Sequence, residues 1–69
     1  MIWYIVQLKN PALSLVDGNV QVMLDEESKK PKSFLSGESA YAWAESVGIT
    51  IDGKYVIVID RDTQEILNV

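Results

Sequence analysis

The chain has 69 residues, enough for one domain, and a net charge of −4 from ten acidic and six basic residues. It contains no cysteine and no histidine, which excludes disulfides, thiol chemistry and the side chain that most often serves as general base or metal ligand. We therefore expect a single domain over residues 1–69 that is not an enzyme and uses no metal or cofactor.

The first predicted element is a strand over residues 2–9, ended by Asn10-Pro11. Every position of 2–6 is apolar, so both faces of this strand are predicted to leave water. Ile2, Tyr4, Val6 and Leu8 share one face, and Trp3, Ile5 and Gln7 share the other. A run of five apolar residues is too short for a signal peptide or a bilayer span, so we expect no membrane and a cytoplasmic location. Residues 12–16 form either a short strand or an apolar flap.

A turn signal at 17–19 precedes a predicted strand over 20–25. Alternation places Val20, Val22 and Leu24 inward, and Gln21, Met23 and Asp25 outward. The polar residues 26–30 are then expected to form a hairpin tip, and 32–35 a short returning strand. This alternating strand is expected near an edge of the sheet.

One helix is predicted, over residues 37–47. Ser36 is a suitable N-cap, and Gly48 a suitable residue for the left-handed turn that follows a helix. Ala40, Trp43, Ala44 and Val47 fall at helical spacing on one face. No other segment has this pattern. The single predicted helix can therefore cover only one face of a sheet that is apolar on both faces.

The last predicted elements are a strand over 54–60, a loop over 60–64 and a strand over 65–69. Residues 55–59 are all apolar, so this strand is expected at the centre of the sheet. The order β-β-(β)-α-β-β predicts an α+β fold: a mainly antiparallel sheet of four to five strands with one helix packed on one face.

The apolar sheet exceeds what one helix can cover, and this predicts a protein-binding module. The helix could cover the face of the first strand that carries Tyr4. In that case the opposite face, with Trp3 and Ile5, needs another cover, which is either residues 12–16 or a partner. A protein partner is expected, either a second copy in a homodimer or a larger protein that this chain inhibits or regulates. The predicted interface consists of Trp3, Ile5, Met23, Val56, Val58 and Leu67, with acidic residues at its rim.

Two other function classes remain open. Lys29, Lys30 and Lys32 form a basic cluster that could bind nucleic acid, but the acidic residues 25–27 directly before it favour neutralisation. A structural subunit of a larger assembly is the third possibility. Asp60, Asp62 and Glu65 are interpreted as turn residues rather than metal ligands. In its short length, acidic balance, lack of cysteine and hairpin followed by SFLSGESAYAWAE, the chain resembles small α+β proteins of bacteriophages and other mobile elements.

Overall fold

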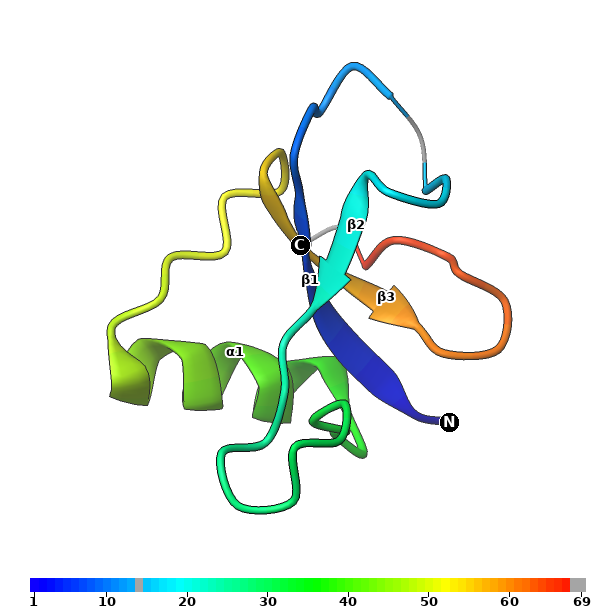
Figure 1. Ribbon diagram of the computed structural model, residues 1–69. Helices are drawn as coiled ribbons and strands as arrows, with labels where there is room; N and C mark the ends of the chain where they lie inside the picture. Colours follow the sequence, from blue (N-terminus) through cyan, green and yellow to red (C-terminus); the bar gives the residue numbers. More distant parts are fainter. Residues whose placement is uncertain (14, 68–69) are drawn as a thin grey trace.

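The computed structural model describes residues 1–13 and 15–67 (Figure 1). It contains β1 (Trp3–Leu8), β2 (Val20–Val22), α1 (Gly37–Val47) and β3 (Val56–Asp60). The sheet order is β2-β1-β3, and both pairings are antiparallel. The predicted α+β class with a mainly antiparallel sheet and one helix is therefore confirmed.

Within the described residues, the sheet has three strands rather than the four or five predicted. The segments expected to add strands contribute only isolated bridges, Trp3 with Phe34 and Ile59 with Ile66. Residues 12–16 form no strand in their described part, and Ser14, Asn68 and Val69 lie outside the described residues. The predicted central position of the strand within 54–60 is also wrong, because β1 is central and β3 lies at an edge.

An apolar strand can lie at this edge because other segments occupy its outer backbone groups. The amide of Leu67 donates to the carbonyl oxygen of Val58 at 2.8 Å, and the amide of Asp60 donates to that of Glu65 at 2.9 Å. At the start of β3, the amide of Val56 donates to Asp52 Oδ1 at 2.9 Å. The edge of β3 is therefore covered without a fourth strand.

The bounds of α1 follow from its two caps. The Ser36 hydroxyl accepts a hydrogen bond from the amide of Ser39 at 3.1 Å. Gly48 has φ 81°, and its amide and that of Ile49 donate to the carbonyls of Glu45 and Ala44, the pattern of a Schellman motif. The sequence predicts these bounds correctly because both caps are local signals.

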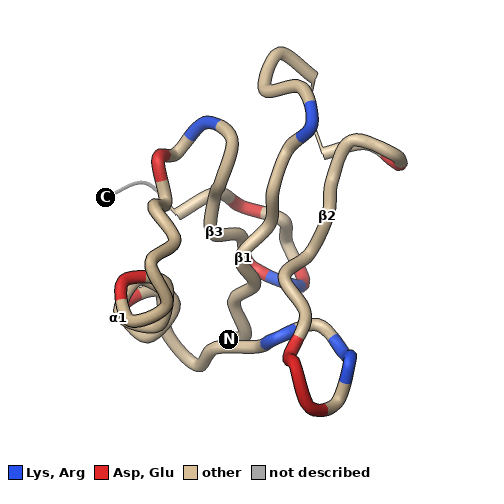
Figure 2. The backbone as a smooth tube through the Cα atoms, turned by 60° about the vertical axis from the view of Figure 1, so that its left-hand side comes forward, with Lys and Arg blue, Asp and Glu red and all other residues tan. Residues whose placement is uncertain are grey.

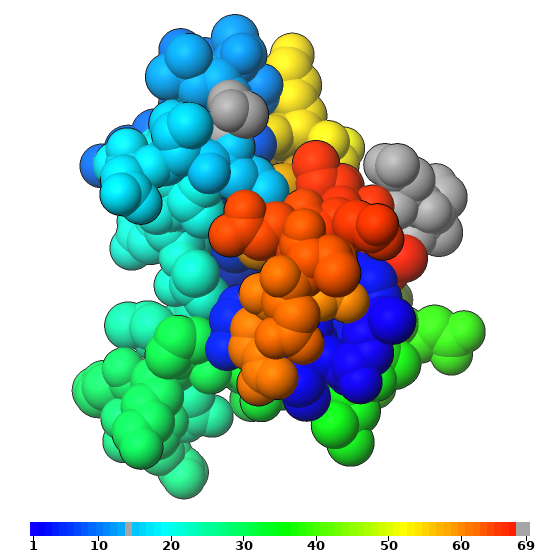
Figure 3. All heavy atoms as spheres, turned by 90° about the vertical axis from the view of Figure 1, so that its right-hand side faces the viewer, coloured from blue at the N-terminus to red at the C-terminus, as the bar shows by residue number. Residues whose placement is uncertain are grey.

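The sheet has a core on each face. Under α1, the buried residues are Ile5, Phe34, Ala40, Ala44 and Val58. On the opposite face the buried residues are Val6, Leu8, Ile57 and Ile59, with Tyr4, Leu15, Val20 and Val22 packed against them. Figure 3, which views the molecule from the side away from α1, shows atoms of segments 15–19 and 60–67 on this side of the molecule.

Candidate interaction surfaces

The helix covers the face of β1 that carries Trp3 and Ile5, not the face that carries Tyr4. Small Ala40 and Ala44 on α1 let the helix pack closely against Ile5. Residues 12–16, one of the two covers that the sequence allows for Ile5, instead contribute Leu15 to the opposite face. The described chain thus packs residues of its own against both faces of the sheet.

The six residues of the predicted interface do lie together, but around the core under α1. Ile5 and Val58 are 0% and 1% exposed, so they present no surface in this fold. Trp3, Met23, Val56 and Leu67 are half-buried and pack against the same cluster. Leu67 lies so close to Gly37, the first residue of α1, that a β-carbon at Gly37 would collide with it.

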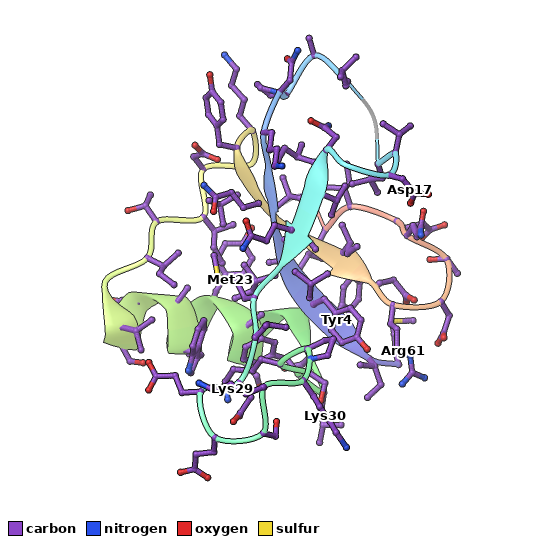
Figure 4. The ribbon with its side chains drawn as sticks, in the orientation of Figure 1. Tyr4, Asp17, Met23, Lys29, Lys30 and Arg61 are labelled. Carbon is purple, nitrogen blue, oxygen red and sulfur yellow. The ribbon has the colours of Figure 1, made fainter. Side chains whose placement is uncertain are left out.

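Met23 and Leu24 exchange the environments that alternation predicts. Met23 packs against the core under α1, and Figure 4 shows its side chain directed from the end of β2 toward the helix. Leu24 lies beyond the end of the sheet and is 53% exposed. The prediction is wrong here because both faces of the sheet are covered, so the outward side of strand 20–25 is the helix side.

The predicted basic cluster lies in the hairpin that follows β2. Asp25 Oδ1 accepts hydrogen bonds from the amides of Glu27 and Ser28 at 2.9 and 3.2 Å. The Lys32 ammonium lies 3.5 Å from Asp25 Oδ2, and it also lies 5.4 Å from the centroid of the Trp43 ring. Lys32 is therefore already engaged within the chain.

Lys29 and Lys30 are exposed, and unlike Lys32 they form no ion pair with a described residue. Figure 2 shows residues 25–27 and 29–30 on opposite legs of the hairpin. Arg61, labelled in Figure 4 beside Tyr4, pairs with Asp62 at 3.2 Å. The three lysines thus do not combine into one free basic surface.

A surface hollow lies between the acidic leg of the hairpin and the second half of α1. Its volume is about 340 Å³. Trp43 is half-buried within it, with its ring centroid 5.6 Å from that of Phe34. Leu24 and Val47 are 53% and 52% exposed. We call this surface the Trp43 hollow; it is lined by Leu24, Asp25, Glu26, Glu27, Lys32, Trp43 and Val47.

The charges that line the Trp43 hollow are mainly negative. Lys32 and Asp25 form an ion pair and offset each other. Glu26 and Glu27 are exposed, and neither belongs to an ion pair with a described residue. Sequence reasoning listed the acidic residues as a rim but missed this hollow, because the approach of the hairpin to Trp43 and Val47 is tertiary.

A second groove lies on the other side of the sheet, between the loop after β1 and the segment after β3. It has a volume of about 740 Å³, and Leu13 and Ile66, which are 52% and 46% exposed, are part of its lining. Lys54 is the one charged residue that lines it. The lining is mixed, because Lys54, Thr63 and Gln64 lie beside the apolar side chains.

The outer edge of β2 is open. The hydrogen bonds from the Lys9 amide to the Asn19 carbonyl and from the Met23 amide to the Ile5 carbonyl fix the pairing with β1. The amides and carbonyls of Val20 and Val22 must then point away from β1. No described backbone group pairs with them. This edge spans only three residues.

Three aspartates hold turns together through backbone amides. Asp52 Oδ1 accepts hydrogen bonds from the amides of residues 54, 55 and 56, each at 2.9 Å. Asp60 Oδ1 accepts from Asp62 and Thr63 at 2.7 and 3.1 Å. Among the described residues, no three acidic side chains are grouped in a way that could hold a metal ion.

These bonds predict that the protein loses stability in acid. The amide of Val56 lowers the pKa of Asp52, that of Thr63 lowers the pKa of Asp60, and that of Ser28 lowers the pKa of Asp25. As the pH falls, these three aspartates therefore bind protons in the unfolded chain at a higher pH than they do in the folded chain. The free energy of unfolding should be constant above about pH 5 and fall as the pH drops below about 4.

Urea denaturation followed by circular dichroism measures this effect. The urea midpoint should be lower at pH 3 than at pH 6. Asp52→Asn keeps a carbonyl acceptor but cannot titrate, so this variant should lose less stability between the two pH values. Equal midpoints at pH 6 and pH 3 in the unmodified protein would contradict the prediction.

Comparisons with protein families, curated proteins and solved structures give no match to this chain. In the described part of the chain, no helix combines the length and the hydropathy needed to cross a membrane.

Proposed function

We propose that this chain is a small, non-catalytic module that binds another protein through the Trp43 hollow. The observation that supports the proposal is that Trp43 lines the same hollow as Leu24 and Val47, two aliphatic side chains that are each about half exposed. Tryptophan is one of the three residue types enriched at binding hot spots, and partly exposed aliphatic side chains beside it can exclude water from such a contact.

The acidic rim of the hollow also suits a protein partner. Protein interfaces combine an apolar centre with a polar, solvent-accessible rim. Leu24, Trp43 and Val47 supply the centre, and Asp25, Glu26 and Glu27 supply the rim. The partner is either a second copy of the chain or a larger protein whose activity the chain regulates.

A capture experiment with matched variants tests the proposal. The tagged chain, the variant Leu24→Lys with Val47→Lys, and the control Leu13→Lys with Ile66→Lys are each incubated with a lysate of the source organism and with the untagged chain. The control adds the same charge to side chains of similar exposure in the other groove. A lysine at position 47 lies in the last turn of α1, where a positive charge is favourable.

We expect the unmodified chain and the control to retain the same protein in equal amounts. The variant with Leu24→Lys and Val47→Lys should retain at least about tenfold less of it. A tenfold loss of affinity corresponds to about 1.4 kcal/mol of binding free energy. Recovery of the untagged chain itself would identify a homodimer. If all three proteins retain the same set, or if only the control loses its partner, the Trp43 hollow does not bind protein.

A further inference from the structure

We infer that the Trp43 hollow accepts a protein segment that carries an apolar side chain next to lysine or arginine. This inference rests on the proposed function and adds the chemistry of the partner. Its basis is the separation of charge in the hairpin, where the acidic residues face the hollow and Lys29 and Lys30 do not line it.

In sequence, the acidic residues 25–27 and the basic residues 29–30 offset one another. In the fold, the turn at 26–28 places them on opposite legs, with Lys29 at φ 60° as the chain reverses. The hydrogen bonds from the amides of Glu27 and Ser28 to Asp25 fix this turn. The hollow therefore has a negative potential on its hairpin side although the hairpin as a whole is nearly neutral.

The position of Lys32 shows that the Trp43 hollow attracts a positive charge. Its ammonium lies 3.5 Å from Asp25 Oδ2, 5.4 Å from the Trp43 ring centroid and 5.7 Å from that of Phe34. A carboxylate and the faces of two aromatic rings are the groups that attract a cation. One cation from the chain is thus already bound there, and it leaves Glu26 and Glu27 without a basic partner among the described residues.

The partner segment follows from these positions. An apolar side chain would lie between Leu24 and Val47 against Trp43, and a neighbouring lysine or arginine would lie beside Glu26 and Glu27. A segment with carboxylates beside its apolar residue would be repelled by the same glutamates. The larger groove near Leu13 has no comparable charge pattern, and the open edge of β2 presents only backbone groups.

Three synthetic peptides test this chemistry directly. Each has about 14 residues, long enough for three to four helical turns. The first carries leucines on one helical face and lysines elsewhere, the second replaces every lysine by glutamate, and the third replaces every leucine of the first by serine. Binding of each labelled peptide to the intact chain is measured by fluorescence polarisation.

Two variants show whether the hollow is the binding site. Glu26→Lys with Glu27→Lys reverses the charge at the hollow. Asp17→Lys with Glu65→Lys makes the same change in net charge at exposed positions outside it. Circular dichroism checks that both variants keep the fold.

We expect the lysine–leucine peptide to bind the unmodified chain and the control variant at least about tenfold more tightly than it binds the hollow variant. It should also bind the unmodified chain at least about tenfold more tightly than the other two peptides do. Equal binding of the glutamate–leucine or lysine–serine peptide, equal weakening by the control variant, or failure of all peptides to bind would overturn the inference. The proposed function would survive these results if the capture experiment still gave a partner that depends on Leu24 and Val47.

Discussion

Replacing Ile5 by lysine is expected to unfold the domain. Ile5 is 0% exposed and lies in the middle of β1, the central strand. It pairs with Val58 of β3 within the sheet, and its side chain belongs to the core under α1. An ammonium group at this position would lose its water with no partner in the surrounding apolar cluster, which costs at least several kcal/mol. A chain of 69 residues has a total stability of only about 3–10 kcal/mol. One substitution therefore exceeds or consumes most of that stability.

Circular dichroism and tryptophan fluorescence measure the outcome. Leu24→Lys is the matched control, because it makes the same chemical change at a side chain that is 53% exposed, and it should keep the fold with little change in stability. A folded Ile5→Lys protein with altered self-association would mean that Ile5 belongs to an interface, as the sequence alone suggests, and that the core described here is wrong.

The helix and the apolar strands could be predicted because their signals are local. Ser36 and Gly48 mark the two ends of α1, and the predicted range 37–47 is the observed one. The prediction for residues 54–60 contains β3, with a difference of two residues at its start. Capping and continuous apolar runs depend on neighbouring residues alone, so they can be recognised in a single sequence.

The assignment of faces could not be predicted because β1 is apolar on both sides. Either face would have accepted the helix, and alternation cannot choose between them. On the second face, Leu15 packs against the buried cluster from the loop between β1 and β2, where no periodicity marks a packed segment. The predicted interface includes Trp3 and Ile5, the residues that would need another cover if the helix lay on the face with Tyr4. The helix lies on their own face, where they belong to the core under α1 or pack against it.

The Trp43 hollow was beyond sequence reasoning for a related reason. Trp43 and Val47 were correctly placed on one face of the helix, but their proximity to Leu24 depends on the path of the hairpin. That path is fixed where the amides of Phe34 and Trp3 each donate to the carbonyl of the other residue at 2.9 Å. A contact between segments about 20 residues apart leaves no pattern in the local sequence.

Phe34→Ala is expected to cause the largest loss of stability among truncations to alanine in the hairpin. Phe34 is 7% exposed, belongs to the core under α1 and lies against Trp43. Truncating a buried phenylalanine costs about 3–5 kcal/mol. For a domain with about 3–10 kcal/mol of stability, that loss removes between a third and all of the free energy of unfolding.

Urea denaturation monitored by tryptophan fluorescence and by circular dichroism measures the effect. Phe34→Leu retains most of the apolar volume and should lose much less stability, and Ser33→Ala, at the exposed neighbouring position, should leave the midpoint almost unchanged. Because the Phe34 ring supports Trp43 and lies beside the Lys32 ammonium, Phe34→Leu should also weaken binding at the Trp43 hollow while the protein stays folded. A Phe34→Ala protein as stable as Ser33→Ala would show that the hairpin is not anchored to the sheet through Phe34, and the hollow between the hairpin and α1 would then lose its structural basis.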